Sequence, residues 1–324
     1  MSEIDDLVHR ADLDGLVRLV DKFCASADWA ELSDLRNRCR TAVATGRQLW
    51  PAATLAEYRL ALWAPAEWAA TVLDEESGRF TIGPLTEVVA QEHRFDDLRA
   101  RLPSGPRLGF IAHECALRGQ SIPDDVPNPL DIPFELRSWE PAYGVAEYSD
   151  EGVVAPAPPL PGSSAFVTTS SDGGERIDDP DVQLAVRQLI EPWTASSNGR
   201  AEIVTVEGSP GDAVAALGVA DAQLARIEPA TAMAWLAWAG ATGGAHGRRR
   251  GAAIGRFGAW WLLAALADLA DAWPVEPDDL GQASAGLEWY WWDGRESRLG
   301  WELQLAIADP AEGYAWAISA HDAA

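Results

Sequence analysis

The segment GATGGAHGRRRGAAIGRFGAWW, residues 240–261, contains the residue types best suited to bind an anion. Arg248, Arg249 and Arg250 are the only run of three basic residues, and they stand where an apolar helical pattern begins. Cations are unfavourable at that positive end of a helix, whereas backbone N–H groups of a glycine-rich approach bind anions there. The candidate anion-binding residues are therefore Gly243, Gly244, His246, Arg248, Arg249, Arg250 and Arg256.

Three partners for these arginines remain open. One is a carboxylate of the same chain, such as Asp278, Asp279 or Glu288. Another is a small phosphorylated or carboxylated molecule, and the third is the acidic surface of a partner protein. Because the chain is rich in carboxylates, the first alternative is favoured.

The same segment has an unusual glycine spacing. Gly247, Gly251 and Gly255 recur every four residues, and Gly258 follows. Each glycine inside a helix costs about 0.8–1 kcal/mol relative to alanine. The spacing therefore predicts that a backbone or a ligand approaches this face closely.

Aromatic residues provide a second candidate surface. Ten of the sixteen tryptophans lie between residues 235 and 316. In the strand pattern LEWYWWD, Trp289 and Trp291 face one side, and Tyr290 and Trp292 face the other. Tyr290 and Trp292 are candidates for a surface that stacks on sugars, nucleobases or a quaternary ammonium. The favoured alternative is that the tryptophans fill a core against alanine-rich helices.

No catalytic, metal or cofactor motif is present. The single lysine, Lys22, is not in a Gly-Lys-[Ser/Thr] step, and H-E-x-x-H, G-x-S-x-G and G-x-G-x-x-G are absent. The three cysteines are widely spaced, and His113 and Cys115 point to different faces of a helix. We therefore predict no metal and no cofactor, and assign no catalytic residue.

The charge excludes two kinds of partner. The net charge is −25, with 26 acidic and 15 basic residues in 1–150 and 24 and 10 in 151–324. Such a surface repels nucleic acids and anionic membranes. The opening MSEIDDLVHR lacks the apolar run of a signal peptide, and the apolar stretches 229–247 and 257–267 fit buried helices better than membrane spans. A cytoplasmic location is the expectation.

The N-terminal part reads as a series of short helices. Apolar residues recur at helical spacing through 1–118, with Asp12 and Asp28 placed to cap two helices. We predict an all-helical domain over 1–122, solenoid-like or an irregular bundle. Residues 123–162 hold nine of the twenty-one prolines and form a linker or a segment laid on a domain, with possible edge strands FELRSW and YGVAEY.

Residues 163–324 alternate strand and helix patterns, which predicts an α+β domain. Strands are expected at 165–169 and 203–208, and helices at 181–193, after Ser209, near 230–241 and near 248–271. Three strands close the chain, and the turn DPAEG makes the last two an antiparallel hairpin. The predicted fold class is α+β, with a helical N-terminal half and an antiparallel-rich sheet packed on helices in the C-terminal half.

The glycine–arginine segment, WYWWD and DPAEGYAWAI resemble an uncharacterised protein family of high-GC Gram-positive bacteria. The resemblance covers most of the chain and implies no activity. The first hypothesis is a non-enzymatic interaction or regulatory protein with a partner surface on its helical half. The alternative is an enzyme or sensor that binds a phosphorylated or carboxylated small molecule at 243–256.

Overall fold

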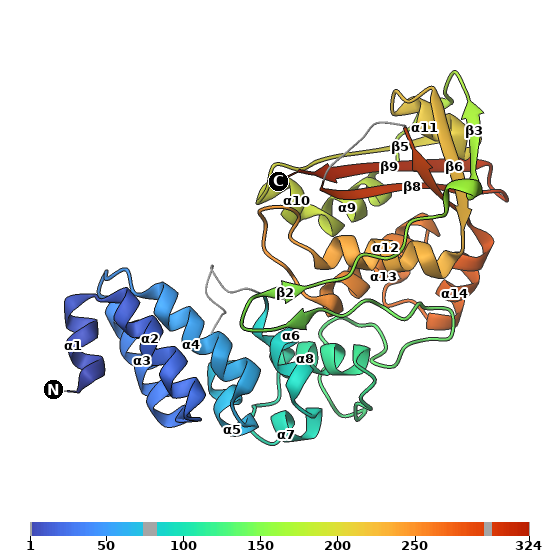
Figure 1. Cartoon of the computed structure of the whole chain (residues 1–324). Coiled ribbons are helices and arrows are strands. Elements are labelled where there is room, and N and C mark those ends of the chain that lie inside the picture. The colour runs from blue at the N-terminus through green and yellow to red at the C-terminus, as the bar shows by residue number, and fades with distance from the viewer. Residues whose placement is uncertain (1, 74–82, 295–299, 324) are drawn as a thin grey trace. The chain divides into compact units, whose positions relative to one another are not determined.

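The computed structural model describes residues 2–73, 83–294 and 300–323, which form two compact units (Figure 1). The helical unit comprises the chain up to Pro129 together with Ala146–Val154. The α+β unit comprises Leu130–Val145 and the chain from Ala155 onward. The proline-rich stretch is thus divided between the two units, and the chain passes from one to the other three times.

Helices follow one another along the N-terminal chain, as the sequence predicts (Figure 1). Asp12 and Asp28 accept backbone hydrogen bonds from Gly15 and Glu31 and so cap the second and third helices. The helices are α1 (Glu3–Arg10), α2 (Leu13–Ala25), α3 (Trp29–Ala44), α4 (Trp50–Trp63), α5 (Ala66–Ala69), the 3₁₀ turn η1 (Ala70–Val72), α6 (Leu85–Glu92), α7 (Phe95–Arg99) and α8 (Pro106–Leu117).

Helix α4 lies at the centre of this unit, and ten of its eleven residues from Ala52 to Leu62 are buried. Buried Glu57 accepts hydrogen bonds from Arg36 and Arg40 of α3, which satisfies its charge. A short hairpin of β1 (Glu147–Tyr148) and β2 (Val153–Val154) completes the unit. The hydroxyl of Tyr148 donates to buried Glu87 at 2.5 Å.

The α+β unit contains a seven-stranded antiparallel sheet among its described residues, in the order β3-β6-β7-β8-β9-β5-β4. This confirms the predicted fold class and the closing hairpin, in which Leu305 pairs with Ile318. The strands are β3 (Phe166–Ser170), β4 (Glu175–Ile177), β5 (Arg200–Glu207), β6 (Asp221–Ile227), β7 (Glu288–Asp293), β8 (Trp301–Asp309) and β9 (Tyr314–Asp322).

Helices cover both faces of this sheet. Trp235 of α12 stacks on Trp291 with ring centroids 4.5 Å apart, so α12 lies on the Trp289 and Trp291 face. Helix α11 packs through Ala213 and Val214 on the face of Trp292. The helices are α9 (Pro180–Leu189), α10 (Glu191–Ala195), α11 (Pro210–Ala216), α12 (Pro229–Ala241), α13 (Ala252–Leu266) and α14 (Pro277–Gly286), with 3₁₀ turns η2 (Ser163–Ala165) and η3 (Ala270–Ala272).

Several elements differ from the sequence expectation. FELRSW forms no strand, whereas β4, β6 and α14 were not expected. Helix α13 begins at Ala252, after the three arginines, because Gly251 takes a positive φ of 101° that a helical residue does not have. Among the described helices, none combines the length and apolar character needed to cross a bilayer.

Candidate functional site

The glycine–arginine segment forms a tight loop between α12 and α13. The backbone N–H of Arg250 donates to the carbonyl of Ala241 at 2.8 Å and closes the loop. A Cβ atom on Gly243 or Gly247 would lie closer than 3.0 Å to backbone atoms of the other residue. These two positions therefore require glycine because the loop folds back on itself.

A carboxylate of the same chain occupies the glycine-rich part of this loop. Asp322, at the end of β9, is 1% exposed, and its Oδ2 accepts from the N–H of Ala245 at 2.5 Å. Gly244 permits this approach, since a Cβ there would also lie closer than 3.0 Å to Oδ2. The N–H of His246 donates to Ser197 Oγ at 3.0 Å, and the His246 side chain is exposed. The backbone of the loop thus binds a carboxyl group of the same chain, a contact that the sequence did not indicate.

The three consecutive arginines lie in this loop before α13. Arg249 is buried, and Arg248 and Arg250 are half-buried. Burial lowers the pKa of Arg248. Burial also lowers the pKa of Arg250, although the negative charge of Glu191 acts to raise it. Arg250 Nη1 donates to the carbonyl of Gln188 at 2.9 Å.

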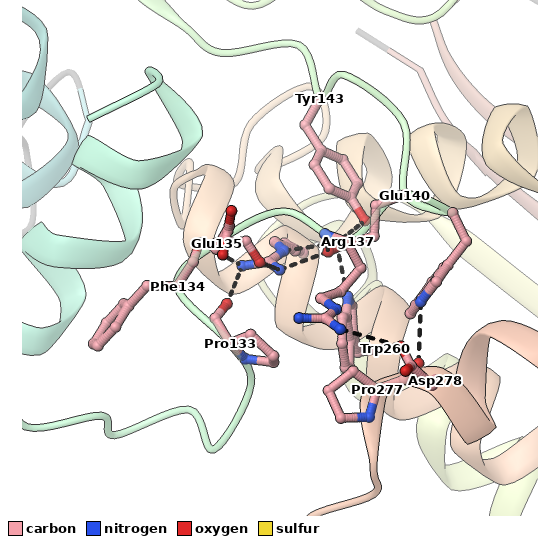
Figure 2. Close-up of polar contacts among 11 residues, drawn as sticks. Pro133, Phe134, Glu135, Arg137, Glu140, Tyr143, Trp260, Pro277 and Asp278 are labelled. Atoms are coloured by element: carbon pink, nitrogen blue, oxygen red, sulfur yellow. Dashed lines mark hydrogen bonds and ion pairs between the residues drawn. The ribbon is translucent and has the colours of Figure 1, made fainter. Parts of the chain in front are cut away.

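Arg256 lies within α13 and belongs to a buried cluster around Glu140, which Figure 2 labels. Its Nε and Nη2 donate to the two oxygens of Glu140 at 2.7 and 2.6 Å, and both side chains have no exposed area. Its Nη1 donates to the carbonyl of Pro133 at 2.6 Å. Trp260 Nε1 and the Tyr143 hydroxyl each donate to Glu140 at 2.8 Å. Arg256 therefore binds a carboxylate in a bidentate manner, and that carboxylate belongs to the chain.

The ionisation of this cluster follows from its contacts. Burial alone would raise the pKa of Glu140, but the hydrogen bonds and charge of Arg256 outweigh it and lower the pKa. Burial, followed by the charge of Glu140, raises the pKa of the Tyr143 hydroxyl well above its ordinary value. Glu140 is therefore ionised and Tyr143 protonated at neutral pH.

Two of the carboxylates expected to meet the arginine run contact other arginines. Arg137 pairs with Asp278 at 3.1 Å (Figure 2), and Arg226 pairs with Glu288 at 3.3 Å. Trp139 Nε1 also donates to the carbonyl of Pro277 at 3.0 Å. These contacts fix residues 133–143 on α13 and α14.

The two aromatic candidates on β7 have different environments. Trp292 has no exposed area, lies under α11, and donates through Nε1 to the carbonyl of Ile318 at 3.0 Å. Tyr290 is half-buried beside the same cluster, and its hydroxyl donates to Glu288 at 2.8 Å. Helix α11 thus covers the second face of the sheet and makes Trp292 a core side chain.

Sequence reasoning missed a pair of residues on α4. Arg59 is 8% exposed, whereas Trp63 is 44% exposed, and the guanidinium carbon of Arg59 lies 4.4 Å from the centroid of the Trp63 ring. Arg59 Nη2 donates to the carbonyl of Asp150 at 3.3 Å, but the buried Nε and Nη1 atoms have no hydrogen-bond partner among the described residues. The sequence does contain a signal for this pair. An arginine precedes a tryptophan by four residues on a predicted helix, which places the two side chains on the same face.

The three cysteines are poorly suited to nucleophilic catalysis. Burial raises the pKa of Cys24 to about 11 and those of Cys39 and Cys115 to about 12. These thiols are therefore protonated at neutral pH and weakly nucleophilic. Within the described residues, no three histidine, cysteine, aspartate or glutamate side chains are grouped so that they could hold a metal ion.

The fold and these contacts define an α+β protein with a helical N-terminal unit, in which Asp322 and Ser197 hydrogen-bond to the backbone of the glycine–arginine loop. The chain belongs to a family of unknown function, DUF6183, whose model matches residues 14–324. No curated protein and no solved structure matches the chain.

Proposed function

We propose that this chain is a non-enzymatic interaction protein whose helical unit binds a basic partner protein at Trp63 and Arg59. The observation that carries the proposal is the exposed Trp63 ring held against the buried Arg59 guanidinium. Tryptophan and arginine are the residues most enriched at the energetic centres of protein interfaces. A large ring left in water gains most by being covered.

The unpartnered nitrogens of Arg59 support the same surface. A buried donor without an acceptor costs about 1–3 kcal/mol, and more when it is charged. Partner backbone carbonyls could supply the missing acceptors, in the way that the carbonyl of Asp150 already does for Nη2. Because Nε and Nη1 are buried and the guanidinium lies against the Trp63 ring, we infer that an acceptor reaches them when this ring shifts. Binding at this site is therefore coupled to a movement of Trp63.

The charge of the chain indicates a basic partner. Residues 1–150 carry 26 acidic against 15 basic residues, and Asp150 and Glu151 are exposed in the hairpin turn beside Arg59. An acidic surface attracts and orients a basic partner and repels an acidic one. The partner would place its cationic side chains near Asp150 and Glu151 and its backbone carbonyls over Arg59.

The alternative, an enzyme or sensor for a phosphorylated or carboxylated small molecule at 243–256, has less support. The N–H groups of Ala245 and His246 are bonded to Asp322 and Ser197, and Arg256 is bonded to Glu140. An external anion that bound these N–H groups or Arg256 would have to displace these internal partners.

A peptide-display selection tests the proposal. Random 16-residue peptides would be selected against the full-length protein, and the enriched peptides synthesised for fluorescence anisotropy. We expect basic peptides whose affinity falls about 30-fold with Trp63→Ala, the size of an interface hot spot. Arg59→Met should weaken binding too without lowering the melting temperature, because it removes an incompletely bonded buried charge. Leu184→Ala is the control, since Leu184 is an exposed apolar residue of the α+β unit.

Two results would contradict the proposal. One is a selection that yields no binding peptide. The other is a set of peptides that bind Trp63→Ala as tightly as the unmodified protein, which would mean that the net charge alone attracts them.

We also propose a cytoplasmic location in a high-GC Gram-positive bacterium. One lysine against twenty-four arginines supports a high-GC coding sequence, and the three free cysteines suit a reducing compartment. Immunoblotting of fractionated cells of such a bacterium would test the location, and recovery from the culture medium would contradict it.

A further inference from the structure

The α+β unit contains a pocket of about 240 Å³ that is distinct from the protein-binding surface proposed above. One wall is α12, through Ala234, Ala237 and Trp238, with Ala252 at the start of α13. The other lining residues are 142–144 and 156–159, and these two segments meet where Gly144 lies against Pro156. The pocket thus lies beside the glycine–arginine loop but outside it.

The chemistry of the lining is almost entirely apolar. The described residues that line the pocket are alanines, prolines, one glycine, Trp238 and Tyr143, and none is charged. The Tyr143 hydroxyl is already bound to Glu140. The Trp238 ring lines the pocket, but its indole nitrogen has essentially no exposed area and so does not face the space. The pocket therefore presents ring faces and methyl groups and lacks a free charged group.

We propose that this pocket binds a small uncharged aromatic molecule of one or two rings. An apolar cavity of about 150 Å³ is enough to bind benzene, so about 240 Å³ accommodates a molecule the size of indole. Trp238 offers a ring for stacking or edge-to-face contact. Ala234 and Ala237, one helical turn apart, leave a flat surface beside that ring.

Hydrogen bonds and close packing hold the walls of this pocket. Tyr143 is held by Glu140, which is held in turn by Arg256 and Trp260 of α13. Gly144 lies against Pro156, because a Cβ there would be 3.1 Å from the Pro156 carbonyl oxygen. A preformed apolar pocket spends little free energy on reorganisation when a ligand enters.

Binding of two ligands of similar size distinguishes an apolar pocket from an anion site at the start of α13. Toluene and benzoate differ mainly in charge, and indole tests the upper size. Isothermal titration calorimetry on the full-length protein should show binding of toluene and indole with a negative heat-capacity change, and at least tenfold weaker binding of benzoate. Saturating indole should raise the melting temperature by roughly 3 °C or more.

A matched pair of variants places the binding in this pocket. Ala234→Leu projects a larger side chain into the space and should abolish the indole response. Ala230→Leu adds the same atoms one turn earlier on α12, at a half-buried position that does not line the pocket. This variant should retain the indole response. The proposal is overturned if indole and toluene give no binding heat, if Ala234→Leu binds like the unmodified protein, or if benzoate binds more tightly than toluene.

Discussion

Gly255 of α13 lies directly against the backbone of Ala237 in α12. A Cβ atom on residue 255 would come closer than 3.0 Å to the carbonyl oxygen of Ala237 and to the amide nitrogen of Ala241. At Gly255 this confirms the close approach that the glycine spacing predicts, and the neighbour is a helix, whereas Gly247 and Gly251 lie before α13. Because backbone atoms cannot move aside as a flexible side chain can, the two helices would have to separate.

Gly255→Ala should therefore destabilise the protein by about 1–3 kcal/mol, through overpacking. Gly255→Leu should cost more. The measurement is the free energy of unfolding in urea. Gly286→Ala in α14 is the control, since a Cβ there meets open space and alanine normally stabilises a helix by about 0.4–1 kcal/mol. Equal stability of Gly255→Ala and the unmodified protein would show that the helices are not in close contact.

Removal of the buried carboxylate at Glu140 should be among the most damaging polar substitutions. Glu140→Gln leaves Arg256 buried without a counter-ion and should cost about 3–5 kcal/mol. Asp278→Asn removes an exposed partner of Arg137 and should change the unfolding free energy little. The double variant Glu140→Gln/Arg256→Met should recover part of the loss, and strict additivity of the two single variants would contradict the pairing.

The same carboxylate predicts a pH dependence. The pKa of Glu140 is lowered in the folded state from its ordinary value of 4.5, so the folded state holds this proton less tightly than the unfolded state. Its contribution is present above pH 4.5 and is lost as the pH falls through the folded-state pKa. Urea unfolding should be measured at a series of pH values. The free energy of unfolding should fall less at acid pH for Glu140→Gln than for the unmodified protein, and identical pH profiles of the two would exclude this contribution.

The hydrogen bond between Ala245 and Asp322 allows a prediction of how the glycine-rich loop responds to added anions. Asp322→Ala leaves the N–H of Ala245 without its acceptor and should cost about 1–3 kcal/mol. Acetate or phosphate should raise the melting temperature of this variant more than that of the unmodified protein, with chloride at equal ionic strength as the control. A large response of the unmodified protein, abolished by Arg248→Ala/Arg249→Ala, would instead support an external anion site.

Limited proteolysis tests the domain boundaries. We predict that cleavage falls first within 123–162 or 170–180. A fragment that begins at residue 163 lacks Glu140 and leaves Arg256 unpaired. It should therefore melt at a lower temperature than a fragment that begins at residue 130. Equal melting temperatures would mean that residues 130–145 add nothing to the α+β unit.

The sequence was most informative where a pattern is local. Trp289 and Trp291 alternate with Tyr290 and Trp292 in β7 as expected, and Ser209 begins α11 with a capping box. Helix and strand periodicity, caps and turns depend on neighbours within a few positions, so they can be read along the chain. The glycine spacing was informative at Gly255, which lies against α12, whereas Gly247 and Gly251 lie before α13.

What the sequence did not reveal depends on pairing over long separations. The segment DAQLARI lacks a strand-like apolar alternation, yet it forms β6 because β3 and β7 hydrogen-bond to its two edges. Glu140 and Arg256 are 116 residues apart, and Asp322 meets the loop from 77 residues away. In a chain with fifty acidic residues, no local feature singles out these two carboxylates.

The threefold passage of the chain between its units has a consequence for synthesis on the ribosome. The helical unit needs the hairpin Ala146–Val154, which is made only after residues 130–145 of the other unit. At about 5–20 residues per second, the 25 residues from Leu130 to Val154 take roughly 1–5 seconds to add. During that interval Glu87 lacks the hydrogen bond that the Tyr148 hydroxyl donates to it in the folded unit. The nascent N-terminal unit therefore waits for a downstream segment before it can close, and is exposed to chaperones and proteases for that long.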